Sequence, residues 1–246
     1  MYTPSLRSEN GKAVGFTLLE LLIVIGIMVI LGTVLVLVLN PAETLKKARD
    51  NQRISDMGTI KTALGLYLTD VSSTDLDASV TNGCLGTNNT AARIFYSSYP
   101  TAGADGTILC TAAVAEGADV DTGDSYSATD YCFHIASPNA AIDGTGWLPV
   151  SLTGISGGSP LSAYPLDPTN TAMATTQTNA TLAYRYACQQ GTMSASGIAN
   201  VFEIDAVLES TAYTSTDNKL TKDGGDNDSY YEVGNNVKLL PTAANF

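Results

Sequence analysis

The sequence predicts an α+β protein in which a long N-terminal helix packs on an antiparallel β-sheet. Three observations support this fold class. An apolar run covers residues 16–39, a helical pattern of apolar residues continues to about residue 69, and strand-like segments follow after residue 130. A helix that precedes a separate group of strands is the arrangement of an α+β domain with one hydrophobic core.

The apolar run is long enough to cross a membrane. Its 24 residues contain one charged side chain, Glu20. As a helix they would extend ~36 Å, against a hydrocarbon core of ~30 Å. A secretory signal peptide is the rival interpretation, but its apolar part spans about 7–15 residues and ends in an A-x-A-like site. The residues after Leu39 supply no such site, so we expect a membrane-spanning helix.

Glu20 is the unusual residue of this helix. An ionised carboxylate costs ~2.5–3.5 kcal/mol at the centre of a bilayer, and such a residue usually has a partner. A count of Lys and Arg on the two flanks would place the rest of the chain in the cytoplasm, and it would leave Glu20 unexplained. The residues next to Glu20 therefore carry more information than the flanking charges.

Those residues form a specific motif, Gly15-Phe16-Thr17-Leu18-Leu19-Glu20, which follows a short polar leader with Lys12 and opens the apolar helix. The motif resembles the class III leader of type IV pilins and type II secretion pseudopilins. The resemblance implies that a prepilin peptidase in the membrane cuts between Gly15 and Phe16 and methylates the new terminal amine. It also implies that Glu20 pairs with the terminal amine of a neighbouring subunit during filament assembly.

The pairing is physically coherent. Each processed subunit would bring a cation at Phe16 and an anion at Glu20 into surroundings of low dielectric constant. Neither charge is stable there alone, so a stack in the wrong register would leave one of them unpaired. The ion pair would therefore fix the register of the filament.

The resemblance implies a domain organisation and a function. We expect a leader at 1–15, a membrane and filament-core helix at 16–40, an amphipathic helix at 41–70 and an acidic globular body of pilin-like fold at 71–246. The chain would be a single-pass membrane protein and then a subunit of a type IV pilus-like filament outside the cell. Its partners would be copies of itself, prepilin peptidase and the assembly machinery. A secretion pseudopilin and a membrane-anchored adhesin that does not polymerise remain alternatives.

The amino-acid composition and net charge argue against a nucleic-acid partner. The chain has 246 residues with 24 Asp and Glu against 12 Lys and Arg, a net charge of −12. Residues 40–61 carry a charge of +2, whereas residues 62–246 set five basic residues against nineteen carboxylates, a charge of −14. Because nucleic-acid binding relies on basic residues that neutralise phosphates, we expect no direct nucleic-acid partner.

Pro41 follows the apolar run and is expected to kink the helix near Leu37 by removing one hydrogen bond. Beyond it, an apolar stripe at steps of mostly three and four predicts an amphipathic helix to about Thr69. The stripe comprises Leu45, Ala48, Met57, Ile60, Leu64, Tyr67 and Leu68. The pairs Glu43–Lys47 and Asp50–Arg53 have helical spacing and are worth a few tenths of a kcal/mol each. The basic face would be solvated or open to neighbouring subunits.

The acidic body begins with an irregular region, residues 71–130. Strands are predicted at 131–135, 182–188, 201–208 and 230–233 from their β-branched and aromatic residues. The stretch from Ser159 to Pro168, with the sequence Pro165-Leu-Asp-Pro168, and the later Tyr184-Arg185-Tyr186 resemble a loop and strand of the pseudopilin and Gram-positive-like pilin branch.

Four cysteines, Cys84, Cys110, Cys132 and Cys188, contain no C-x-x-C pair, which favours disulfides over a zinc site. Four cysteines permit three connectivities. We expect Cys84 with Cys110 and Cys132 with Cys188.

No cofactor is required, but a calcium site is considered at Asp223, Asp226 and Asp228, which lie in a glycine-containing turn. A solvated acidic turn is the alternative. The spacing is not that of an EF-hand.

No enzyme activity is predicted, and no catalytic residue is assigned. Gly154-Ile-Ser156-Gly-Gly158 matches G-x-S-x-G, but Pro160 and Pro165 break the helix that a nucleophile elbow needs. The sole histidine, His134, precedes the serine, opposite to the chain order of that hydrolase class.

Overall fold

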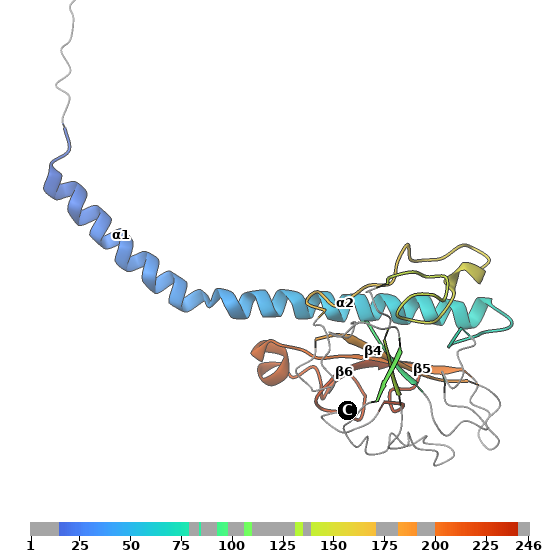
Figure 1. Cartoon of the computed structure of the whole chain (residues 1–246). Coiled ribbons are helices and arrows are strands. Elements are labelled where there is room, and N and C mark those ends of the chain that lie inside the picture. Colours follow the sequence, from blue (N-terminus) through green and yellow to red (C-terminus); the bar gives the residue numbers. More distant parts are fainter. Residues whose placement is uncertain are drawn as a thin grey trace, which may run out of the picture. The chain divides into compact units, whose positions relative to one another are not determined.

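The computed structural model describes residues 15–78, 84, 93–97, 106–109, 131–134, 139–170, 182–190 and 200–240. The chain forms two compact units that meet between Thr44 and Leu45. Helix α1 (Leu18–Leu39) belongs to the first unit, and most of helix α2 (Pro41–Asp70) belongs to the second together with the sheet (Figure 1). The predicted α+β class is confirmed at this level.

The boundary between the two helices is a single residue, Asn40. It has a left-handed backbone, φ 38°, and Pro41 starts α2 immediately afterwards. Proline suits the first helical position because no backbone donor is needed there. The Asn40 side chain accepts from the backbone N–H of Glu43 at 3.4 Å, and its carbonyl accepts from that of Thr44 at 3.2 Å. The expected kink near Leu37 is therefore wrong, and the helix instead breaks at Asn40.

Six strands form one sheet in the order β2-β3-β1-β4-β5-β6. Strands β1, β4, β5 and β6 are antiparallel neighbours, as expected, but β1 and β3 run parallel. The sheet is therefore mixed. Strand β3 is antiparallel to β2 on one side and parallel to β1 on the other. The strand bounds are β1 Arg93–Tyr96, β2 Gly106–Leu109, β3 Tyr131–His134, β4 Tyr184–Gln189, β5 Val201–Ala206 and β6 Tyr231–Gly234.

The four predicted strands are confirmed as β3 to β6, although each is shorter than expected or slightly shifted. Strands β1 and β2 were not predicted, because each has four residues and lies in a region rich in turn-forming residues. Helix α2 ends at Asp70, within one residue of the end that the apolar stripe predicted.

The hydrophobic core lies between α2 and one face of the sheet, and Figure 1 shows α2 running across β4, β5 and β6. Side chains alternate along a strand, so every second residue of β4 and β5 points to the helix. These are Tyr184, Tyr186, Cys188, Phe202, Ile204 and Ala206. From α2 come Met57, Ile60, Leu64 and Tyr67. Leu45 and Ala48 were expected in this stripe but are exposed.

A disulfide joins Cys84 to Cys188, with the two Cα atoms 4.7 Å apart. The expected pairs Cys84–Cys110 and Cys132–Cys188 are therefore wrong. The reason is the path of the chain after α2. The backbone N–H of Leu76 donates to the Gln190 side chain at 2.7 Å, so this segment returns to the end of β4, where Cys188 lies. Cys110 and the side chain of Cys132 lie outside the described residues.

Candidate functional site in the N-terminal helix

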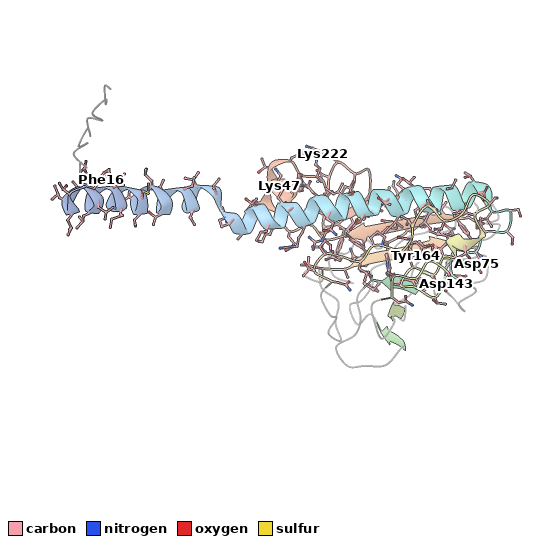
Figure 2. All side chains as sticks on the ribbon, turned by 90° about the horizontal axis from the view of Figure 1, so that it is seen from above. Phe16, Lys47, Asp75, Asp143, Tyr164 and Lys222 are labelled. Atoms are coloured by element: carbon pink, nitrogen blue, oxygen red, sulfur yellow. A yellow bond between two sulfur atoms is a disulfide. The ribbon has the colours of Figure 1, made fainter. Side chains whose placement is uncertain are left out.

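Helix α1 exposes apolar side chains all around its circumference. Its 22 residues correspond to a length of ~33 Å, enough for a hydrocarbon core of ~30 Å. All its described side chains are exposed, and Figure 2 shows them projecting on both sides of the ribbon. Within the described part of the chain, one helix is long and apolar enough to span a membrane, and its apolar window lies in α1.

Thr17 and Glu20 organise the start of α1. Thr17 has an extended backbone, and its hydroxyl oxygen accepts from the backbone N–H of Glu20 at 3.2 Å. This is the spacing of a capping box, in which Thr is the N-cap residue and Glu occupies the third helical position. The cap fixes Glu20 in the first helical turn, where the partial positive charge of the helix terminus favours a carboxylate.

Thr17 was expected only as one residue of the leader motif, and its capping role was not predicted. The T-x-x-E spacing before an apolar run was the signal that could have revealed it.

The Glu20 carboxylate has no hydrogen-bond donor or cation within reach among the described residues. Its neighbours along the helix surface are large apolar side chains, and Leu19 is 70% and Leu21 59% exposed. A carboxylate alone in an apolar surface is costly once water leaves it.

The predicted cleavage position lies just before α1. Gly15 and Phe16 are exposed and not helical, and Phe16 is 82% exposed. Leader residues 1–14 lie outside the described part of the chain.

A second cluster of charges was missed by the sequence analysis. Arg53 of α2 is completely buried. It donates to both carboxylate oxygens of Asp167, at 2.6 and 3.0 Å, and to Glu209 at 2.7 Å. It also donates to Asp50 at 2.8 Å, and Asp50 accepts from the backbone N–H of Ser210 at 2.7 Å. The cluster ties α2 to the loop before Pro168 and to the segment after β5.

The cluster shifts the pKa values of its members. Burial by itself would lower the pKa of Arg53, but the hydrogen bonds and charges of Asp167 and Glu209 raise it above its ordinary value. The hydrogen bond from Arg49, together with that from Arg53, lowers the pKa of Glu209 to about 2. Arg53 is therefore a structural cation held inside the protein, and it is not available to a neighbouring subunit.

The C-terminal acidic turn closes on itself through backbone hydrogen bonds. The Asp223 carboxylate accepts from the backbone N–H groups of Gly225 at 3.0 Å and Glu232 at 2.9 Å. Asp226 and Asp228 are exposed. Among the described residues, no three acidic, histidine or cysteine side chains are grouped so that they could hold a metal ion. Calcium binding by Asp223, Asp226 and Asp228 stays an untested prediction.

Ser156 contacts the end of α2. Its hydroxyl and backbone N–H donate to Asp70 at 2.7 and 2.6 Å, which lowers the pKa of Asp70. A short 3-10 turn, Leu152–Gly154, precedes the serine in place of the strand that a nucleophile elbow requires. The side chain of His134 lies outside the described residues.

Comparison of the whole chain with protein-family models, with curated proteins and with solved structures finds no match.

Proposed function

We propose that this chain is a structural subunit of a type IV pilus-like filament. It is inserted in the membrane through α1, cut between Gly15 and Phe16, and polymerised through the same helix. The observation that carries the proposal is Glu20, a single carboxylate in the first turn of a helix whose other described side chains are exposed and almost all apolar. The leader motif described above supports it.

Cleavage would create the missing cation. Hydrolysis of the bond after Gly15 leaves a carboxylate on the leader and a free amine on Phe16, and methylation keeps that amine basic. The amine of one subunit can then pair with Glu20 of the next. In an apolar environment this ion pair compensates two charges that would each be unfavourable alone. It forms in only one register of neighbouring subunits.

The exposure of α1 supports assembly over simple anchoring. In a membrane its apolar surface contacts lipid, and in a filament the same surface contacts the α1 helices of other subunits. Contacts of this head-to-tail kind do not close on themselves and so generate filaments. An anchor needs the apolar surface but has no use for a carboxylate in it.

The decisive experiment compares two first-turn glutamates, Glu20 of α1 and Glu43 of α2. We expect Glu20→Gln to reduce filaments in sheared surface fractions at least ~10-fold, the effect of losing ~1.4 kcal/mol per subunit contact, while the membrane level of the protein is unchanged. Glu43→Gln is the matched control and should assemble normally. Filaments of Glu20→Gln at control levels would refute the proposal and favour an anchored adhesin.

Mass spectrometry of the mature protein tests processing separately. The expected product begins with N-methylated Phe16. A protein that functions with residues 1–15 still attached would contradict the proposal.

A further inference from the structure

The sheet face opposite α2 carries a row of buried charged residues. Because side chains alternate along a strand, Arg185 of β4, Glu203 and Asp205 of β5 and Glu232 of β6 all point away from the helix. Each is at most 5% exposed. Arg185 forms an ion pair with Asp205, whereas the two glutamates have no cation of their own among the described residues.

Glu203 and Glu232, which we term the carboxyl pair, each hold a neighbouring segment with one oxygen. Glu203 Oε2 accepts from the backbone N–H groups of Leu239 at 2.6 Å and Leu240 at 2.8 Å. Glu232 Oε2 accepts from the backbone N–H of Asn227 at 3.0 Å. The carboxyl pair thus fastens the C-terminal segment and the acidic turn to the sheet.

The second carboxylate oxygen of each glutamate is buried and lacks a hydrogen-bond donor within the described structure. Neither Glu203 Oε1 nor Glu232 Oε1 has a hydrogen-bond partner among the described residues, although the two side chains lie diagonally on the same face of the neighbouring strands β5 and β6, within reach of each other. An ionised carboxylate only accepts hydrogen bonds, so a bond between the two groups requires a proton on one of them. With that proton, the second oxygens satisfy each other.

We propose that a proton shared by Glu203 and Glu232 fastens the C-terminal segment at Leu239 and Leu240 to β5, and that loss of this proton at alkaline pH releases the segment. Without the proton two buried carboxylates face each other. Movement of Glu203 away from Glu232 relieves this repulsion, and it also withdraws the acceptor that holds both leucine amides.

The surrounding charges favour the protonated state. Burial is the largest cause that raises the pKa of both glutamates, and it raises that of Glu232 to about 7. Asp205 on β5 raises both values further, and Asp223 of the acidic turn adds to that of Glu232. Arg185 of β4 is committed to Asp205, and Lys238, next to Leu239, is exposed.

The stability that the carboxyl pair provides decreases as the pH rises. In an unfolded chain these glutamates would ionise near their ordinary pKa of 4.5, whereas in the folded chain the pair keeps a proton to higher pH. Its contribution to stability is therefore complete below about pH 4.5 and is lost as the pH rises through the raised pKa values.

Hydrogen exchange at the Leu239 and Leu240 amides tests this, with the full chain in detergent micelles between pH 5 and 9. In Glu203→Gln the side-chain amide replaces the shared proton permanently. Relative to this variant at the same pH, exchange in the wild type should accelerate at least ~10-fold from pH 6 to pH 9, about one pKa unit of linked opening. Glu43→Gln, which lies outside the pair, should behave like the wild type.

Glu232→Gln provides the same permanent donor from the opposite side, so it replaces Glu203→Gln if that variant does not fold. Equal acceleration in the wild type and in either folded variant of the pair would overturn the proposal. So would amides that exchange rapidly at every pH. The measurement requires neither cleavage nor assembly, and its outcome is therefore independent of the proposed filament function.

Discussion

Helices α1 and α2 are separated by one residue, yet a charged side chain of each, Glu20 and Arg53, differs in burial and in ion pairing. In α1 the one charged side chain, Glu20, is exposed and has no partner among the described residues. In α2 the charged side chain of Arg53 is fully buried and is bound by three carboxylates of the same chain. The charge of Arg53 is therefore paired within the fold, whereas the charge of Glu20 would, under the proposed function, be paired by another subunit.

Under the proposed function, this difference would separate the charges that serve folding from the charge that serves assembly. An ion pair that forms within the body stabilises a fixed position of α2 on the sheet. An unpaired ion on an exposed apolar helix contributes nothing to that fold, and it becomes useful when a second molecule supplies the counter-charge. Four changes test this division, in addition to the Glu20 experiment.

The largest effect on stability is expected from Arg53→Ala. It would leave Asp50 and Asp167 buried without their cation, and breaking a buried pair in this way costs ~3–5 kcal/mol. Chemical denaturation of the full chain in micelles measures the loss. Arg49→Ala is the matched control, because Arg49 also binds Glu209 but is 35% exposed, and its loss should cost much less. Equal costs for the two variants would remove the contrast between buried and exposed cations.

The next effect concerns the other end of α2, where the chain returns to the sheet. Replacing Cys84 and Cys188 together by serine should lower the free energy of unfolding by ~2–5 kcal/mol, the usual cost of losing a native disulfide. Peptide mapping without reduction should recover these two cysteines in one linked fragment. A fragment that links Cys84 to Cys110 would contradict the structure.

A smaller, pH-dependent effect is expected from Glu209. Its pKa is lowered to about 2 by the hydrogen bonds from Arg49 and Arg53. The stability it provides is therefore present above its ordinary pKa of 4.5 and is lost as the pH falls from 4.5 to about 2. In thermal unfolding, Glu209→Gln should show a shallower loss of stability over this acid range than the wild type. An unchanged slope would exclude Glu209 as the linked group.

The smallest effect is expected at the start of α1. Thr17→Ala removes the N-cap hydrogen bond and should cost ~1 kcal/mol of local helix stability. Hydrogen exchange at the amide of Glu20 should report it, because that N–H is the donor in the cap. Thr17→Ser, which keeps the hydroxyl, should retain the protection. If Ala and Ser behave alike, the cap does not position Glu20.

Sequence reasoning could single out Glu20 as a candidate because a charge in an apolar run can be recognised without knowledge of the fold. It could not find the Arg53 cluster, because Asp167 and Glu209 lie 114 and 156 residues further along the chain. The spacing of Asp50 and Arg53 indicated a helix but gave no sign that both are buried.

Separation along the chain also explains why the disulfide pairing was predicted wrongly. Its two cysteines are 104 residues apart, and their approach depends on the return of residues 71–78 to the end of β4. Strands β3 to β6 were accessible to prediction because their apolar and aromatic residues form recognisable runs. The parallel pairing of β1 with β3 depends on the order of strands in space, which local patterns do not specify.

The helix boundary at Asn40 is a suitable position for truncating the chain. Since this residue both ends α1 and caps α2, α2 has its N-cap without α1, and a hydrogen bond joins the two helices, from the Thr44 hydroxyl to the Leu39 carbonyl at 3.3 Å. A recombinant chain that starts at Asn40 would keep a complete N-cap and omit the apolar helix. Such a truncation offers a water-soluble form of the acidic body for crystallisation and binding assays.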